Sequence, residues 1–114
     1  MDLVQSAYRE ELATFRVASA QGDHLAAWRA LERGHILAQA RLPLHLHSHA
    51  VMLAYALARR EWGEVSGQVF RLLLAPLGTL TGRLPVGNTG RTNVSAFASM
   101  PLPEDIADLL NGER

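Results

Sequence analysis

The sequence predicts an all-α domain of four helices, followed by an irregular strap and a short terminal helix. Hydrophobic residues recur at helical spacing through residues 3–77, and glycines or prolines interrupt them at about the length of a helix. Beyond residue 77 the composition changes to turn-forming residues. A chain of 114 residues fits a single domain, residues 1–114, with one core. We expect either an up-and-down bundle or two stacked helical hairpins.

The first two helices are predicted at about residues 3–20 and 24–40. Gly22 ends the first, because glycine readily adopts the left-handed conformation that follows many helices. Asp23 is a suitable N-cap for the second, since its carboxylate can accept from a free backbone N–H. Leu25 and Leu31 mark the face of the second helix that we expect to point inward.

Prolines and glycines indicate where the third and fourth helices and the C-terminal region begin or end. Pro43 suits the first turn of the third helix, where a missing N–H is tolerated. The fourth helix is predicted from Glu61 to about Leu74 or Ala75, with Pro76 and Gly78 stopping it. Residues 78–102 then form the turn-rich strap and residues 103–111 the terminal helix.

Composition excludes several classes of function. Eleven basic and eleven acidic residues cancel, which argues against a nucleic-acid-binding protein. The absence of cysteine excludes disulfides, thiolate catalysis and iron–sulfur clusters. No apolar run approaches membrane-spanning length, and the N-terminal residues lack a signal-peptide pattern. A cytoplasmic protein without membrane contact is therefore expected.

Three histidines alternate in the segment Pro43-Leu-His-Leu-His-Ser-His. In a strand all three side chains would share a face, whereas in a helix His45 and His49 lie one turn apart and His47 points away. The residues that follow are rich in alanine and leucine over several turns, which favours the helix. His45 and His49 thus form a candidate pair.

Polar residues interrupt the inward faces of three predicted helices. They are Glu32, His35 and Gln39 on the second helix, His45 and His49 on the third, and Glu61, Glu64, Gln68 and Arg71 on the fourth. Buried charges are costly unless they are paired or bind a metal ion. This pattern therefore requires either a ligand or a hydrogen-bonded network.

A transition-metal site is the leading interpretation. Glu32-x-x-His35 has the spacing by which one helix offers a carboxylate and an imidazole to a metal ion in a bundle core. The predicted ligands are Glu32, His35, His49 and Glu64, with His45 as the alternate, and Gln39, Gln68 and Arg71 are expected to contact them from behind. Zinc, iron, copper or nickel suits such a site better than calcium.

Two other interpretations remain open. The same residues could form a structural network in a non-catalytic interaction module, with His35 bonded to Glu64 and His49 to Glu32. Such a module would bind a protein partner or a second copy of the chain. The third interpretation is a small metal-dependent enzyme, for which the sequence names no substrate.

Several motifs, in order, resemble a family of short bacterial proteins, domain-of-unknown-function family 3703. The motifs are Leu31-Glu-Arg-Gly-His35 with Gln39, His45 and His49 with Met52, Glu64-x-x-Gly-Gln68-x-x-Arg71, Pro85-x-Gly-Asn-Thr-Gly90, and Asn93-Val-Ser-Ala-Phe97. The resemblance covers about residues 8–110. It implies a bacterial source, supplies no activity, and directs attention to the same polar residues.

Overall fold

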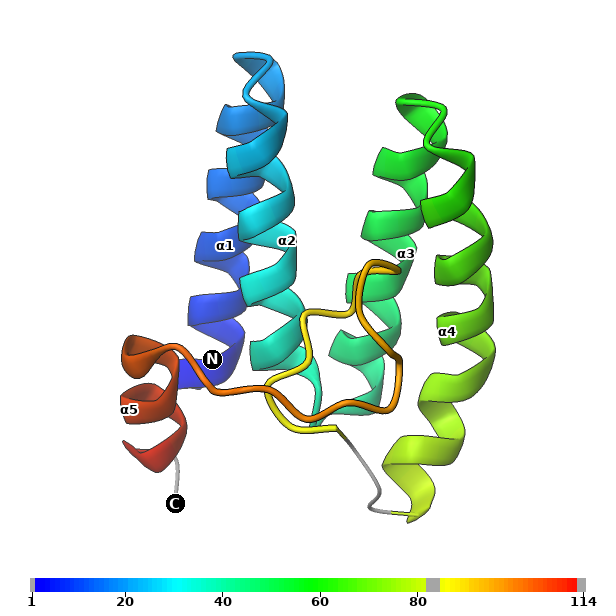
Figure 1. The fold of residues 1–114 in the computed structure, drawn as a ribbon. Coiled ribbons are helices and arrows are strands. Elements are labelled where there is room, and N and C mark those ends of the chain that lie inside the picture. Colours follow the sequence, from blue (N-terminus) through cyan, green and yellow to red (C-terminus); the bar gives the residue numbers. More distant parts are fainter. Residues whose placement is uncertain (1, 82–84, 113–114) are drawn as a thin grey trace.

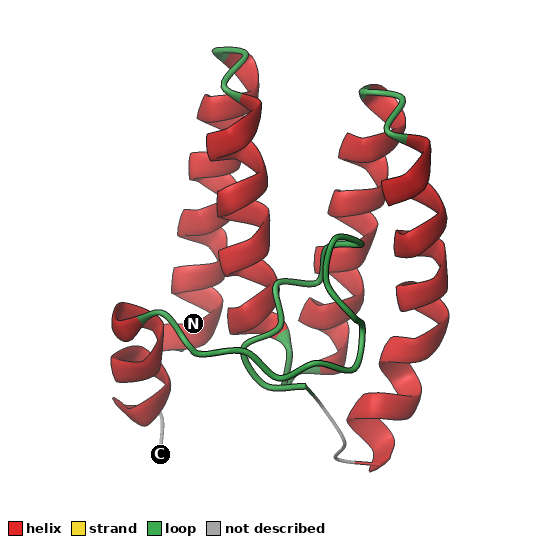
Figure 2. Ribbon diagram, in the orientation of Figure 1, coloured by secondary structure: helices red, strands yellow, loops and turns green. Residues whose placement is uncertain are grey.

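The computed structural model describes residues 2–81 and 85–112 of the chain. Its elements are five helices: α1 (Leu3–Ala20), α2 (His24–Ala38), α3 (Leu42–Ala58), α4 (Trp62–Thr81) and α5 (Glu104–Gly112). Figure 2 shows helices joined by loops, with no strand among the described residues. The predicted all-α class is confirmed.

The four long helices form two antiparallel hairpins. The α1 helix packs against α2 and α3 packs against α4, while contact between α2 and α3 joins the two hairpins. This is the stacked-hairpin form of the two predicted arrangements. The strap, residues 85–103, crosses in front of both hairpins and leads to α5, which lies beside the N-terminal part of α1 (Figure 1).

Local signals in the sequence explain where the hairpins turn. Gly22 has φ 74°, and the Asp23 side chain accepts a hydrogen bond from the backbone N–H of Ala26, as expected for an N-cap. The turn between α3 and α4 instead uses Arg60, a non-glycine residue at φ 57°. Both hairpins therefore turn through a left-handed residue.

The α4 helix extends past its predicted end. It continues through Pro76 to Thr81, so the first four residues of the predicted strap are helical. A proline removes one backbone donor and crowds the preceding turn, but it does not have to end a helix. The hydroxyl of Thr81 donates to the carbonyl of Leu77, 2.7 Å away, within this last turn. Residues 82–84 of the predicted strap lie outside the described residues.

The main core lies between the helices and is built around aromatic side chains. The Tyr55 ring contacts Phe15 and Trp28 edge to face, with centroids 5.0 and 5.2 Å apart. Met52 is fully buried in the same cluster. Leu31 is buried as predicted, but Leu25 is 75% exposed, because it lies on the outer side of α2.

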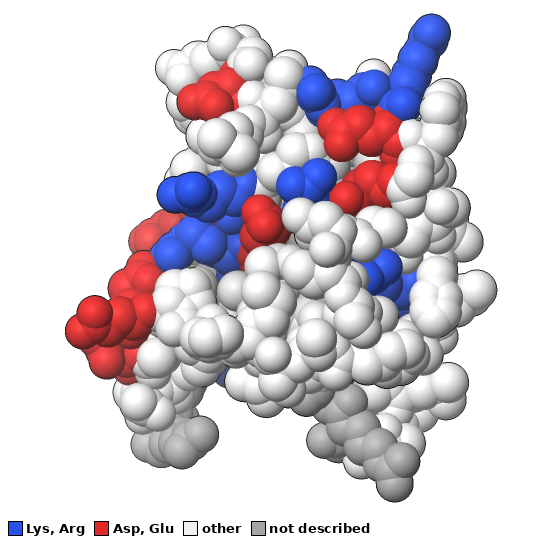
Figure 3. Space-filling view, in the orientation of Figure 1, with Lys and Arg blue, Asp and Glu red and all other residues white. Residues whose placement is uncertain are grey.

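The surface is mixed in charge. In the view of Figure 3 acidic and basic side chains lie next to one another over the hairpins, whereas the surface around the strap is largely uncharged. No helix in the described part of the chain combines the length and apolar character that a membrane span requires.

Candidate metal centre

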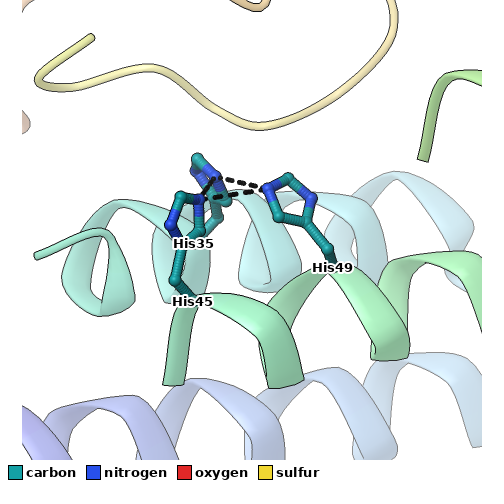
Figure 4. Close-up of side chains that lie close together, drawn as sticks. All are labelled: His35, His45 and His49. Carbon is teal, nitrogen blue, oxygen red and sulfur yellow. Dashed lines mark hydrogen bonds between the residues drawn. The ribbon is translucent and has the colours of Figure 1, made fainter. Parts of the chain in front are cut away.

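Three histidine rings meet between α2 and α3 (Figure 4). The Nε2 atom of His35 lies 3.1 Å from the Nε2 atoms of both His45 and His49, and the last two are 3.2 Å apart. The three residues are only 2%, 5% and 2% exposed. Three equivalent nitrogens therefore converge on one buried point.

The helices place these rings. His45 and His49 are one turn apart on α3, and His35 lies in the last turn of α2, which packs on α3. His47 points the other way: it is exposed, and its Nδ1 shares a 2.8 Å hydrogen bond with the Tyr8 hydroxyl. The predicted helical facing of the alternating histidines is thus confirmed.

The strap fixes which nitrogen of His35 carries its proton. Nδ1 of His35 lies 2.8 Å from the backbone carbonyl oxygen of Asn88. A carbonyl can only accept, so Nδ1 of the neutral ring donates its hydrogen there. The Nε2 atom that faces the other two rings consequently has a free lone pair.

A chain of hydrogen bonds also fixes which nitrogen of His49 carries the proton. Nδ1 of His49 is 2.7 Å from Oε1 of Gln68. The amide nitrogen of Gln68 donates to Glu64 Oε2 at 2.8 Å and to the carbonyl of Gly90 at 2.9 Å, so its oxygen must face the histidine. His49 therefore also donates through Nδ1 and presents a lone pair on Nε2.

While all three rings are neutral, the histidines have too few N–H donors to pair with all of their buried nitrogen lone pairs. Two lone pairs face each other across 3.1 Å, and His45 can contribute at most one proton between them. If His45 places that proton on Nε2, its Nδ1 keeps a buried lone pair, and Nδ1 of His45 has no hydrogen-bond partner. A shared cation would satisfy all three Nε2 atoms together.

The surroundings keep the rings unprotonated. Burial and the neighbouring His49 lower the pKa of His45 to about 4. Burial also lowers the pKa of His49 to about 4; the nearby Arg71 charge acts in the same direction, and the Gln68 bond and Glu64 oppose it. The pKa of His35 lies well below its usual value, mainly through burial and then through the two other rings. Lone pairs are therefore available at neutral pH.

The two predicted carboxylate ligands lie elsewhere. Among the described residues, the group of possible ligand atoms within 4.8 Å of one another contains the three histidines and neither Glu32 nor Glu64. Glu64 accepts hydrogen bonds from Gln68, Arg91 and Thr92. Burial opposes its ionisation, but these bonds outweigh that effect and lower its pKa. Glu32 is half-buried, and burial raises its pKa.

The three residues that we expected to contact the ligands, Gln39, Gln68 and Arg71, have two different roles. Gln68 contacts a histidine directly, as described. Gln39 instead donates to the carbonyl of Pro85 at 2.8 Å, and Arg71 donates to the carbonyls of Val94 at 2.7 Å and Gly67 at 3.3 Å. Gln39 and Arg71 therefore connect the helices to the strap.

Asn88 is the residue that sequence reasoning missed. It is 2% exposed, and its side-chain amide donates to the carbonyls of Ser95 and Ala98 while its side-chain oxygen accepts from the N–H of Gly90. These bonds hold the backbone carbonyl that His35 contacts. The signals in the sequence were its place in a turn-rich segment and in the motif Pro85-x-Gly-Asn-Thr-Gly90, and neither reveals where its carbonyl points.

Gly90 permits the strap to approach His35. Its φ is 82°, and a Cβ atom at this position would lie 2.6 Å from His35 ring atoms. Both the backbone conformation and the missing side chain are therefore required here.

Comparison with known proteins places the chain in a family. The model of the family described as "Protein of unknown function (DUF3703)" matches residues 2–110. The chain belongs to the DUF3703 family. No curated protein and no solved structure matches it. The family match agrees with the resemblance seen in the sequence, and the description of the DUF3703 family names no activity.

The three histidines also form part of the wall of a pocket of about 300 Å³. The other walls come from α4, including Arg71, Leu74 and Leu77, and from the strap. An ion held by the histidines would thus be accessible to a small molecule.

Proposed function

We propose that this chain binds one transition-metal ion through the Nε2 atoms of His35, His45 and His49. The facing lone pairs of His35 and His49 support this most directly, because neither ring has a hydrogen atom to place between them. The proposed ligand set is smaller than the predicted one. Glu32 is not a direct ligand in it, and Glu64 acts through Gln68.

The spacing of the three nitrogens suits such an ion. Zinc–nitrogen bonds are about 2.0–2.1 Å long, so an ion bonded to all three would sit roughly 1 Å from the plane of the nitrogens. Imidazole ligands favour zinc, iron, copper or nickel over calcium or magnesium. A site with three protein ligands keeps at least one coordination position open, as in metal sites that bind a substrate.

The contacts behind the histidines also support metal binding. Metal-binding histidines usually donate their second N–H to a carbonyl or a carboxylate, which fixes the ring. His35 donates to the Asn88 carbonyl, and His49 donates to Gln68, which donates to Glu64. His45 has no such partner for Nδ1.

Metal content tests the proposal. Tag-free protein is analysed by mass spectrometry after exposure to zinc, copper, nickel or iron and removal of loosely bound ions. About one equivalent is expected for the wild type and much less for His35→Ala. His47→Ala is the matched control, because it removes an exposed histidine from the same helix that carries two of the ligands. Equal metal content in all three proteins would contradict the proposal.

The structural-network alternative has one observation in its favour. His35 and His49 connect α2 and α3 to the strap and to α4 through hydrogen bonds in which a metal ion takes no part. These bonds differ from the predicted His35–Glu64 and His49–Glu32 pairs. If they were the whole role of the histidines, His35→Ala would cost roughly 1–3 kcal/mol of stability whether or not metal is present. A loss that appears mainly in metal-loaded protein favours the metal site instead.

A further inference from the structure

Among the described residues, the pocket beside the three histidines is lined by one buried cation and by no acid. Arg71 is the only Asp, Glu, Lys or Arg among the described residues that line it. Its side chain comes from the middle of α4 and is only 8% exposed. The electrostatic character of the pocket is therefore positive, and a metal ion at the histidines would make it more so.

In the part of the chain that the structure describes, no carboxylate is hydrogen-bonded to Arg71. Its two bonded nitrogens donate to backbone carbonyls, of Gly67 and Val94, and its Nε is buried with no hydrogen-bond partner. Glu64 acts on its charge from a distance, but the carboxylate oxygens of Glu64 already accept from Gln68, Arg91 and Thr92. A buried guanidinium without an ion pair carries a desolvation cost that a bound anion would offset.

Arg71 and the three histidines line the same pocket, Arg71 from α4 and the histidines from α2 and α3. An anion between Arg71 and a metal ion would thus interact with both. Guanidinium groups form strong, charge-assisted hydrogen bonds to carboxylates.

The remaining walls are mostly apolar. Leu74, Ala75 and Leu77 line the pocket from α4, and Pro85 and Phe97 line it from the strap side. The outer surface around the strap is also largely uncharged (Figure 3). The pocket volume of about 300 Å³ is at the small end of the range for small-molecule sites. A ligand here needs an apolar body and a single anionic group.

We propose that the pocket binds a small monocarboxylic acid, with its carboxylate between Arg71 and the metal ion and its apolar part against α4 and the strap. The proposal rests on the metal site proposed above. A phosphate group is less suitable, because its additional charge and oxygens would need more donors than Arg71 and one metal ion supply.

Cobalt-substituted protein tests the two proposals separately. Cobalt(II) bound to the three histidines has a visible absorption spectrum, so metal uptake is recorded before any carboxylate is added. Benzoate is then titrated, with benzamide as a neutral compound of the same shape. Benzoate is expected to change the cobalt spectrum with a saturating dependence, and benzamide is expected to bind at least tenfold more weakly.

Two variants locate the binding site. Arg71→Gln is expected to weaken benzoate binding at least tenfold while cobalt still binds. Because Arg71 also holds the strap through Val94, a second variant, Leu74→Phe, fills the pocket without removing that bond and is likewise expected to block benzoate. His47→Ala serves as the control that binds both cobalt and benzoate normally.

The outcomes are distinguishable. A protein that takes up no cobalt overturns the metal site and the carboxylate site together. A protein that takes up cobalt but shows no response to benzoate overturns only the carboxylate site. Equal binding of benzoate and benzamide, unchanged benzoate binding in both pocket variants, or tighter binding of inorganic phosphate than of benzoate also overturns it.

Discussion

At the scale of single residues, the protonation of two rings determines the chemistry of the site. Asn88 and Gln68 each accept from an Nδ1 atom, and this turns two Nε2 lone pairs toward each other. Each acceptor by itself raises the pKa of the ring that it contacts, but burial outweighs this effect and keeps both rings neutral. The same carbonyl and amide fix the orientation of the rings and so prepare the site for a metal ion.

Gln68 should influence metal affinity more than Gln39 does. Gln68→Met removes the acceptor that orients His49, and loss of such a contact typically weakens metal binding by about 10–100-fold. Gln39→Met removes a similar amide that bonds only the strap, at Pro85, so its metal affinity should change by a few-fold at most. Competition titration with a coloured zinc chelator measures both. Similar losses in the two variants would contradict the proposed contact.

The pKa values of the histidines make a prediction for metal-free protein. Unfolded histidines titrate near 6.5, whereas His45 and His49 titrate at about 4 in the folded chain. Between these values the unfolded state binds more protons, so the free energy of unfolding should decrease as the pH falls from about 6.5 to about 5. The slope is up to about 1.4 kcal/mol per pH unit for each buried histidine.

Urea denaturation at several pH values measures this slope. His45→Ala is the useful comparison, because removing one of the lowered groups should make the dependence shallower by one histidine's contribution. Below the folded pKa of about 4 both states bind the proton, so the loss should level off. Stability that is constant from pH 7 to pH 5 would be inconsistent with buried neutral imidazoles.

At the scale of elements, the helices carry the three histidines, and the strap supplies the backbone carbonyl that orients His35. The sequence was sufficient to predict the helical facing of His45 and His49 and the inward direction of His35, because both follow from a fixed number of residues per turn. It was not sufficient for Asn88 and Gly90, since the path of an irregular segment depends on long-range contacts. The α4 end was also missed, because a proline weakens a helix without fixing where it stops.

The positions of Glu32 and Glu64 could likewise be predicted only in part from the sequence. Glu32 and Glu64 lie on the faces that the helical period predicts, at intermediate and buried positions. Which acid meets which ring depends on how α2, α3 and α4 pack. Glu64 is bonded to Gln68 and to Thr92 of the strap, a contact across 28 residues that no local pattern contains.

Gly90→Ala tests the role of the strap. The new methyl group would meet the His35 ring, and the positive φ is unfavourable for alanine, so both stability and metal affinity should decrease. Strain of this kind costs on the order of 1–3 kcal/mol. Gly63→Ala is the matched control, since it adds the same group in open space at the start of α4. Thermal melting and zinc titration of the two variants should differ clearly, and identical results would contradict the close approach.

At the scale of the whole molecule, the candidate site connects both hairpins and the strap. His35 belongs to the first hairpin, His45 and His49 belong to the second, and Asn88 belongs to the strap. Because these parts separate on unfolding, an ion that binds all three rings binds only the folded state.

Metal should therefore stabilise the entire fold. Ligand present at 1,000 times its dissociation constant adds about 4 kcal/mol to the free energy of unfolding. Zinc-loaded protein should melt well above metal-free protein, and chelation should reverse the shift. His45→Ala should melt at one temperature with or without zinc. A wild-type melting temperature that zinc does not change would argue for a purely structural cluster.

The most direct measurement is a crystal structure of zinc-loaded protein with anomalous diffraction recorded on both sides of the zinc absorption edge. The proposed site predicts one strong anomalous peak about 2.0–2.1 Å from the Nε2 atoms of His35, His45 and His49, on the pocket side. A peak bound instead by Glu32 or Glu64, or no peak between α2 and α3, would contradict it.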